Sequence, residues 1–222
     1  MKKNIYKLVM IVTLVMMVGI SNAGVDFGAD LVSRYVWRGT DFGNSASVQP
    51  FLSVGAAGFE AGAWASYPIT SAGANENDLY LSYAIGPVGF AITDYYFPGD
   101  TSIVKFGNYS DEGNHILEAS VSFEMAGFSA LGAVNIYGDI DAAGDKRNSF
   151  YLEAGYELYN EDDLSVNAFA GVGNELYVVN DDGDPGLVNL GVTASKGNLS
   201  ASYIINAEAD VSYLVFGYSI GF

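Results

Sequence analysis

The sequence contains no cysteine and a single histidine, and only 9 basic residues stand against 26 acidic ones. The absence of cysteine fits an exported chain, in which stray thiols would form wrong disulfides. The shortage of Lys and Arg argues against nucleic acid as a partner, because an acidic chain repels phosphates. With one histidine, the chain also has little to offer as a general base, so no catalytic site is expected.

Long hydrophobic runs are also missing from most of the chain. Hydrophobic residues make up 50% of the sequence, and the mean hydropathy is +0.21. After Ala23, however, no run approaches the roughly 18 apolar residues of a membrane-spanning helix. The apolar residues must therefore follow another pattern.

The first 23 residues have the composition of a secretory signal peptide. Lysines near the start precede an apolar run from Leu8 to Ile20, and small residues follow at Ser21 and Ala23. The run is too short to cross a membrane as a helix. We predict a signal peptide over residues 1–23 and one exported domain over 24–222. Without the three lysines of the signal, six basic residues face 26 acidic ones, a net charge of −20.

Alternation of apolar and smaller or polar residues is the pattern that remains, and it is clearest at the C-terminus. Every second residue from Leu214 to Phe222 is apolar, while Ser219 and its neighbours on the other face are small. Side chains on a strand alternate between faces, so this is a strand with one apolar side. The same pattern recurs along the chain and predicts about twelve strands, each long enough to cross the hydrocarbon when tilted.

The connections between these strands alternate between short turns and long acidic or glycine-rich loops. Outer-membrane barrels have short periplasmic turns and longer external loops, and their strands must close because open edges are costly in hydrocarbon. We therefore predict an all-β fold, a closed antiparallel transmembrane β-barrel of about 12 strands in the bacterial outer membrane. Its outer partners would be membrane lipid and lipopolysaccharide. A soluble all-β secreted protein is the alternative fold.

Three local predictions follow from the alternation. The first strand would continue from Val25 to Arg38, with both Arg34 and Arg38 facing the interior. Val188 would face outward. Asp94 has outward parity, which is costly at membrane depth, so it lies either above the membrane or on a bulge that turns it inward; we favour the bulge.

Some segments resemble a known family. The motif Ser33-Arg34-Tyr35-Val36-Trp37-Arg38-Gly39, followed by Gln49-Pro50 and by Gly62-Ala63-Trp64-Ala65-Ser66, is similar to the opening of the TorF-type porin family. The resemblance covers most of the mature chain in weaker form. It implies an outer-membrane barrel that passes small solutes, and it supplies no catalytic or binding residues.

Charged residues on the inward parity are candidates for lining a pore or its constriction. These candidates are Asp30, Arg34, Arg38, Asp78, Glu118 and Glu153. One interpretation is a constriction whose transverse field orients polar solutes. The other is a structural ion-pair cluster that fills the lumen. The spacing along one strand does not fix the heights of side chains on other strands, so both interpretations remain open.

Inward aromatic residues are candidates for stacking on solutes, namely Trp64, Tyr80, Tyr95 and Tyr151. Packing within the wall is the alternative, and we favour it. With small residues on the remaining inner positions, the sequence favours a porin for passive diffusion of ions and small hydrophilic molecules, weakly preferring cations because the wall is acidic. A homo-oligomer is left open.

Two other functions are alternatives. A structural, adhesive or closed barrel could act through its acidic loops, including residues 139–145 and 180–184, whose oxygens resemble Ca²⁺ ligands. Neither loop has the EF-hand spacing, so no metal site and no cofactor are expected. An outer-membrane hydrolase would need His115, which lies at the end of a strand on the outward parity, with no serine beside it on that face.

Overall fold

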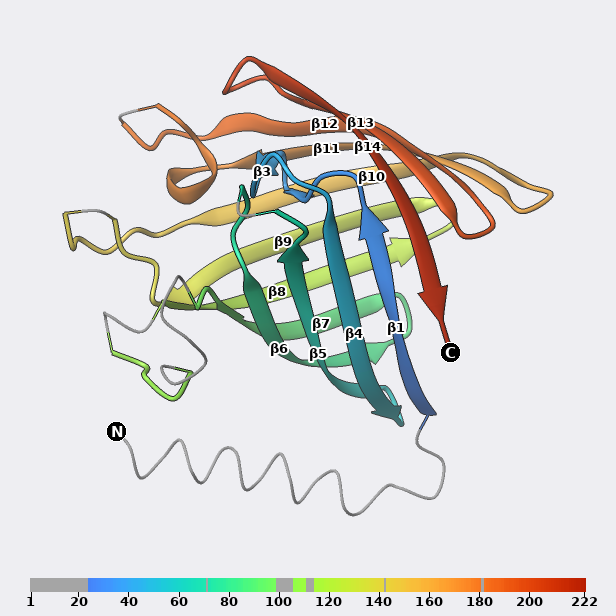
Figure 1. The fold of residues 1–222 in the computed structure, drawn as a ribbon, viewed down its shortest axis with the longest axis horizontal. Coiled ribbons are helices and arrows are strands. Elements are labelled where there is room, and N and C mark those ends of the chain that lie inside the picture. Colours follow the sequence, from blue (N-terminus) through green and yellow to red (C-terminus); the bar gives the residue numbers. More distant parts are fainter. Residues whose placement is uncertain (1–23, 71, 99–105, 111–113, 142, 181) are drawn as a thin grey trace.

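A computed structural model describes the chain except for residues 1–23, 71, 99–105, 111–113, 142 and 181. The predicted signal peptide lies outside the described residues. Twelve strands form one closed antiparallel barrel in which each strand pairs with its neighbours in the chain, apart from a small separate hairpin between the first two barrel strands. The predicted fold class is therefore confirmed (Figure 1).

The barrel strands are β1 (Gly24–Val32), β4 (Ser47–Ala56), β5 (Phe59–Pro68), β6 (Glu76–Ile85), β7 (Val88–Tyr96), β8 (His115–Met125), β9 (Phe128–Tyr137), β10 (Phe150–Glu161), β11 (Leu164–Gly173), β12 (Gly186–Lys196), β13 (Leu199–Asn206) and β14 (Val211–Gly221). The separate hairpin consists of β2 (Val36–Trp37) and β3 (Thr40–Asp41), and η3 (Glu175–Tyr177) is a 3₁₀ turn after β11. No helix in the described part of the chain is long and apolar enough to cross a membrane.

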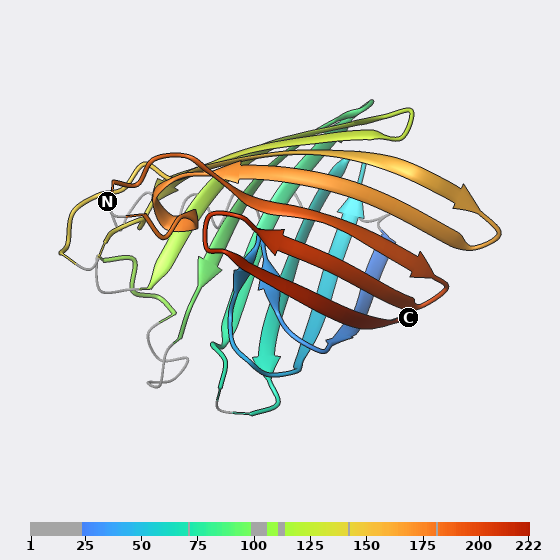
Figure 2. The same cartoon turned by 90° about the horizontal axis from the view of Figure 1, so that it is seen from above.

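Closure occurs between the first and last strands. β1 pairs with β14 from Gly28 opposite Gly221 to Val32 opposite Gly217, while its other edge pairs with β4 along its whole length. The final residue, Phe222, stacks on Phe27 with ring centroids 5.5 Å apart. The stacked rings of Phe27 and Phe222 thus help to fasten the seam between β1 and β14. Figure 2 shows the barrel from above.

The outer face of the barrel is apolar and open to its surroundings. Val25, Leu52, Ile92, Leu152 and Phe216 each expose more than half of their surface. The inner face instead carries polar and small side chains, many of them buried. Short turns lie at one end and long loops at the other, which is the left-hand end in Figure 1. The alternation in the sequence therefore corresponds to the two faces of one cylinder.

The first prediction about local structure is wrong. β1 ends at Val32 instead of continuing to Arg38. Ser33 still bonds to the last strand, with its backbone N–H 2.8 Å from the Phe216 carbonyl oxygen. Beyond it the chain leaves the wall and forms the β2–β3 hairpin. Arg34 and Arg38 therefore do not belong to the barrel wall.

Val188 points inward, contrary to its parity in the sequence. The pairing of β11 with β12 shifts register, so that Gly171 faces Asn189 while the adjacent Val172 faces Leu187. Val188 is the extra residue of this β-bulge, and it is completely buried, whereas Leu187 takes the outward position.

The bulge favoured for Asp94 is also wrong. β7 pairs with β6 and β8 without a register shift, so Asp94 keeps the outward parity of Ile92. It is nevertheless 8% exposed. Its carboxylate lies 2.8 Å from His115 Nδ1 and accepts a hydrogen bond of 2.6 Å from the Tyr109 hydroxyl. A loop residue and a neighbouring strand thus satisfy the carboxylate on the outer wall.

Candidate functional site

The candidate site is built around an inner hairpin, residues 36–41, which lies in the connecting segment 33–46. Trp37 pairs with Thr40, so only Arg38 and Gly39 form the turn. Both have positive φ, 51° and 77°. Such a two-residue turn with two positive φ angles is typical of tight β-hairpins, and glycine at its second position makes it accessible.

The tip of the inner hairpin presses against the wall formed by β12 and β13. A Cβ atom on Gly39 would lie 1.8 Å from the carbonyl oxygen of Val188 in β12. The Asn206 side chain in β13 also donates a hydrogen bond of 3.1 Å to the Gly39 carbonyl oxygen. In the barrel order β13 lies two strands and β12 three strands from β1, so the tip contacts a part of the wall close to the strand that the hairpin follows.

Arg38 anchors the hairpin to the wall through a bidentate ion pair. Its Nη1 and Nη2 lie 2.5 and 2.9 Å from the two carboxylate oxygens of Glu118 in β8. Nη1 also donates to the Tyr177 hydroxyl at 2.6 Å. The guanidinium carbon lies 4.4 Å from the Trp37 ring centroid and 4.5 Å from that of Tyr151. The planar guanidinium is suited to this combination of forked hydrogen bonding and stacking.

This ion pair is almost dry, because the side chains of Arg38 and Glu118 are 8% and 2% exposed. Burial alone would lower the pKa of Arg38, but its hydrogen bonds to Glu118 and the negative charge of the surrounding groups together outweigh burial, and the pKa rises above its usual value. The guanidinium therefore stays charged. Removing one partner of such a pair would leave a buried charge uncompensated, which costs several kcal/mol.

The other flank of the segment packs against the opposite side of the barrel. Tyr35 is buried against Trp64 of β5, with centroids 5.5 Å apart. Phe42 stacks on Phe97, which follows β7, at 5.9 Å. Burial, followed by the negative charge of Glu76, raises the pKa of Tyr35 above its usual value. The segment thus bridges both halves of the loop end of the lumen.

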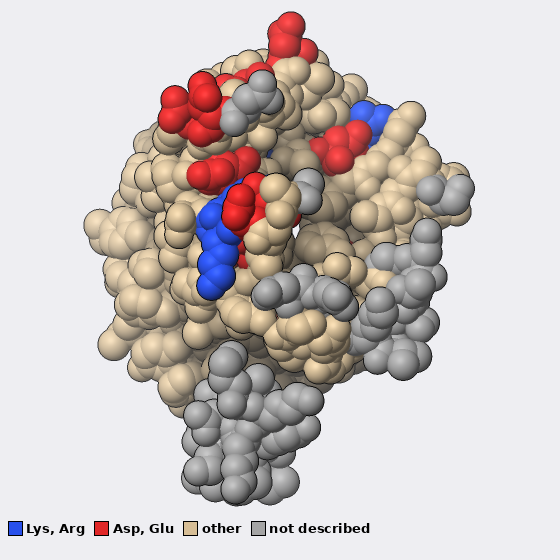
Figure 3. Space-filling model, turned by 90° about the vertical axis from the view of Figure 1, so that its left-hand side faces the viewer, with Lys and Arg blue, Asp and Glu red and all other residues tan. Residues whose placement is uncertain are grey.

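The structure brings only some of the six predicted lining residues together. Arg38 and Glu118 are brought together at the hairpin. Glu153 is linked to them through Tyr151, whose hydroxyl donates to Glu153 and whose ring lies under Arg38, and Glu153 also accepts a hydrogen bond of 2.8 Å from Asn189. Arg34 instead forms an ion pair of 3.4 Å with Asp41 of the same segment. Figure 3 shows acidic and basic side chains side by side at this end.

Among the described residues, the two remaining carboxylates form no hydrogen bond or ion pair with Arg38 or Glu118. Asp30 lies on β1 opposite Gln49 and Ser219, and it is partly exposed. Asp78 lies on β6 opposite Trp64 and Tyr95 and is 6% exposed. The candidates therefore do not form one ring around the lumen.

Three of the four stacking candidates contact the inner segment. Trp64 packs on Tyr35, Tyr95 lies 5.2 Å from Trp37, and Tyr151 lies under Arg38. Tyr80 is the exception: it donates 2.8 Å to Glu60 and lies over Gly62. Trp64, Tyr95 and Tyr151 therefore pack against residues of the segment 33–46.

Sequence reasoning did not identify Tyr177, Asn189, Asn206 or Phe42 as parts of this site. Tyr177 comes from η3, in a loop, and Asn189 is placed by the bulge at Val188. One signal was available for the hairpin itself, because Arg38-Gly39 between short alternating residues fits a two-residue turn. Nothing in the sequence showed where this hairpin would dock.

His115 lies on the outer wall, away from the hairpin. Its Nδ1 faces Asp94 and its Nε2 lies 2.9 Å from the Phe106 carbonyl oxygen. The imidazole is stacked between Tyr96 and Tyr109, with centroids 4.5 and 4.1 Å away. This environment gives the ring a packing and hydrogen-bonding role at the point where residues 106–110 meet the wall.

In the acidic loop that begins at residue 139, the carboxylates form their hydrogen bonds and ion pair within residues 139–149. The Asp139 carboxylate pairs with Arg147 at 3.0 Å and accepts from the Ser149 backbone N–H at 3.1 Å. Asp141 accepts from the backbone N–H groups of Ala143 and Asp145. Within the described residues, no group of three or more His, Asp or Glu side chains is arranged to hold a metal ion.

These features define the class of protein as a twelve-stranded antiparallel β-barrel with a hairpin folded across its lumen at the loop end. A bacterial protein family of unknown function, Gcw_chp, has a model that matches residues 19–219. The chain belongs to this family. No curated protein matches the sequence.

Proposed function

We propose that the protein is an outer-membrane porin of the TorF type, through which ions and small hydrophilic solutes diffuse passively. The observation that carries this proposal is a closed barrel with an exposed apolar outer face and a polar inner face. Apolar surface of that extent is unusual on a soluble monomer, and membrane lipid with lipopolysaccharide would cover it.

The inner hairpin supports a narrow constriction at the extracellular end. Because Glu118 neutralises Arg38, this arginine contributes little net field for anions. The mature chain carries 26 acidic residues, and carboxylates such as Asp30 and Glu60 lie on inward positions. A negative wall favours cations, so the pore would be weakly cation-selective.

Recording from the refolded mature chain in planar lipid bilayers tests this function. With a KCl gradient across the bilayer, we expect discrete current steps and a reversal potential whose sign shows that K⁺ passes more readily than Cl⁻. The absence of steps, or a reversal potential of the opposite sign, would contradict the proposal.

A closed barrel is a second candidate, favoured by the way the hairpin spans the lumen between Val188 in β12 and Glu118 in β8. A shortened barrel distinguishes the two. In this variant an Asn-Gly turn replaces residues 33–46, which is feasible because Val32 and Ser47 are directly paired and can be joined by a two-residue turn. Current from the shortened barrel alone would identify the native protein as closed.

A further inference from the structure

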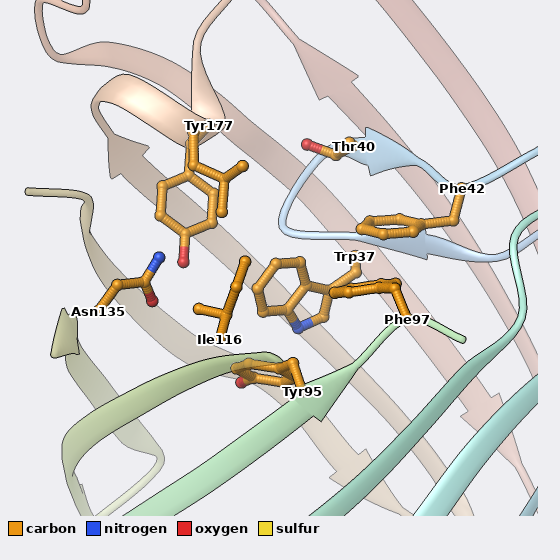
Figure 4. A pocket seen from close by; sticks show the side chains of 9 residues that line it. Trp37, Thr40, Phe42, Tyr95, Phe97, Ile116, Asn135 and Tyr177 are labelled. Atoms are coloured by element: carbon orange, nitrogen blue, oxygen red, sulfur yellow. The ribbon is translucent and has the colours of Figure 1, made fainter. Parts of the chain in front are cut away.

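A cavity of about 300 Å³ lies between the inner hairpin and the wall formed by β7, β8 and β9. Its lining is aromatic on several sides. The rings come from the hairpin segment, from β7 and the residue after it, and from η3, as Figure 4 shows. They are Trp37, Phe42, Tyr95, Phe97 and Tyr177.

These rings form a cage with a defined shape. Trp37 lies edge-on to Tyr95 at 5.2 Å and to Phe42 at 6.1 Å. It is tilted against Tyr177 at 5.7 Å, while Phe42 and Phe97 are stacked. Rings set in several planes offer both faces and edges to a flat guest. The volume is at the lower end of the range for small-molecule sites, which limits the guest to one or two rings.

One polar group interrupts the apolar lining. The Nδ2 atom of Asn135 is buried, yet it has no hydrogen-bond acceptor among the described residues. Figure 4 shows its amide on the cavity side of β9, near Ile116 and below Tyr177. A buried donor without a partner is unfavourable, and a ligand with an acceptor would recover that lost hydrogen bond.

The electrostatics disfavour a cation in the cage. Aromatic cages commonly hold quaternary ammonium groups. Here the Arg38 guanidinium already lies 4.4 Å from the Trp37 ring and 5.6 Å from that of Tyr177. A second cation would be repelled both by this charge and by the positive end of the Asn135 N–H dipole.

We propose that this cavity is a binding site for small, flat, neutral aromatic compounds that carry one hydrogen-bond acceptor. The rings enclose the aromatic part, and the Asn135 side chain donates to the acceptor. The site is independent of ion conduction, since it needs only the seated hairpin. It places a selective ligand site at the mouth of a barrel whose proposed transport is otherwise non-specific.

Acetophenone, a flat ring with one carbonyl group, is the probe that tests the site. The chain has two tryptophans, so Trp64→Phe leaves Trp37 as the reporter. We expect saturable quenching of Trp37 fluorescence by acetophenone in the refolded mature chain. α-Methylstyrene has nearly the same shape without the acceptor and should compete about tenfold less well, the equivalent of one hydrogen bond.

Variants in the Trp64→Phe background assign the hydrogen bond. Asn135→Leu should weaken acetophenone binding about tenfold and leave α-methylstyrene binding unchanged or tighter. Phe42→Leu should weaken both probes, because it removes one side of the cage. Asn167→Leu, the same change on β11 outside the cavity, should affect neither probe.

Three results would each overturn the inference: equal acetophenone binding by Trp64→Phe with and without Asn135→Leu, no saturable binding, or preferential binding of tetramethylammonium. Conductance is measured separately. A barrel that conducts without binding acetophenone would contradict only this inference. A barrel that binds acetophenone without conducting would contradict only the porin proposal.

Discussion

At the scale of single residues, the position of the hairpin depends on one arginine and one glutamate. Arg38 and Glu118 are paired through two hydrogen bonds in a nearly dry environment. The arginine also adopts a positive φ, which costs a side-chain-bearing residue about 1 kcal/mol or more. The ion pair, the Tyr177 hydroxyl and the flanking rings together offset that cost.

Glu118→Gln should therefore loosen the hairpin without opening the barrel. The change leaves Arg38 buried without a counter-charge, and breaking one partner of such a pair costs about 3–5 kcal/mol. We expect amide hydrogen exchange at residues 36–41 to accelerate by at least about tenfold. Glu60→Gln is the control, since Glu60 accepts from Tyr80 away from the hairpin. Unchanged exchange in Glu118→Gln would show that the pair does not anchor the hairpin.

Gly39→Ala tests the close approach of the hairpin tip to β12. The added Cβ would lie 1.8 Å from the Val188 carbonyl oxygen, so the tip would have to withdraw. We expect the emission of Trp37, measured in the Trp64→Phe background, to shift to longer wavelength as the ring meets water. Gly197→Ala is the matched control, because Gly197 also has a positive φ but has open space around it. Similar spectra for both variants would disprove the steric account.

At the scale of elements, the segment 33–46 is held by buried tyrosines as well as by charge. Burial raises the pKa of Tyr35 and of Tyr177 above the usual value, with nearby carboxylates adding to the effect. When the hairpin is detached, both hydroxyls titrate near pH 10. The seated state holds its protons more tightly, so its advantage is complete below about pH 10 and declines as pH rises further.

Alkaline titration of Trp37 emission in the Trp64→Phe background measures this effect. We expect the hairpin to stay seated through neutral pH and to detach above about pH 10. The double change Tyr35→Phe and Tyr177→Phe removes the titrating hydroxyls and should flatten the dependence. Detachment at neutral pH, or an unaltered alkaline transition in the double variant, would contradict the role of these tyrosines.

The sequence was informative about the wall and uninformative about the segment inside it. Alternation assigns faces correctly along strands such as β14, because each face meets one environment over its whole length. It fails at Val188, where a bulge exchanges the faces. At Asp94 the alternation assigns the outward face correctly, but the bulge favoured there is wrong because Tyr109 and His115 satisfy the carboxylate on the outer side. Neither partner is near in sequence, so no local pattern could reveal them.

The same reasoning explains what was missed in the site. The inward parity of Glu118 and Tyr95 was predicted correctly, but their common partner is the hairpin, whose destination is set by contacts with β8, β10, β12 and β13. A sequence pattern states which face a residue occupies. It does not state what crosses the lumen in front of that face.

At the scale of the whole molecule, lipid contact with the outer face is the premise of the transport proposal. Ile92 exposes 52% of its surface near the middle of β7. Ile92→Arg should reduce the free energy of unfolding in lipid vesicles by about 2–4 kcal/mol, because it places a charge in hydrocarbon. Ser120→Arg, on the lumen side of β8, should cost less. A urea titration of the refolded variants measures both, and equal losses would argue against a lipid-facing wall.

The unitary conductance of the shortened barrel, compared with that of the wild type in the same planar bilayers, tests the central claim most directly. The claim is that solutes cross through the lumen and that the hairpin sets its width. It predicts that replacing residues 33–46 by an Asn-Gly turn preserves the closed barrel and raises the conductance several-fold. Identical conductance for the two proteins, or no current from either, would contradict it.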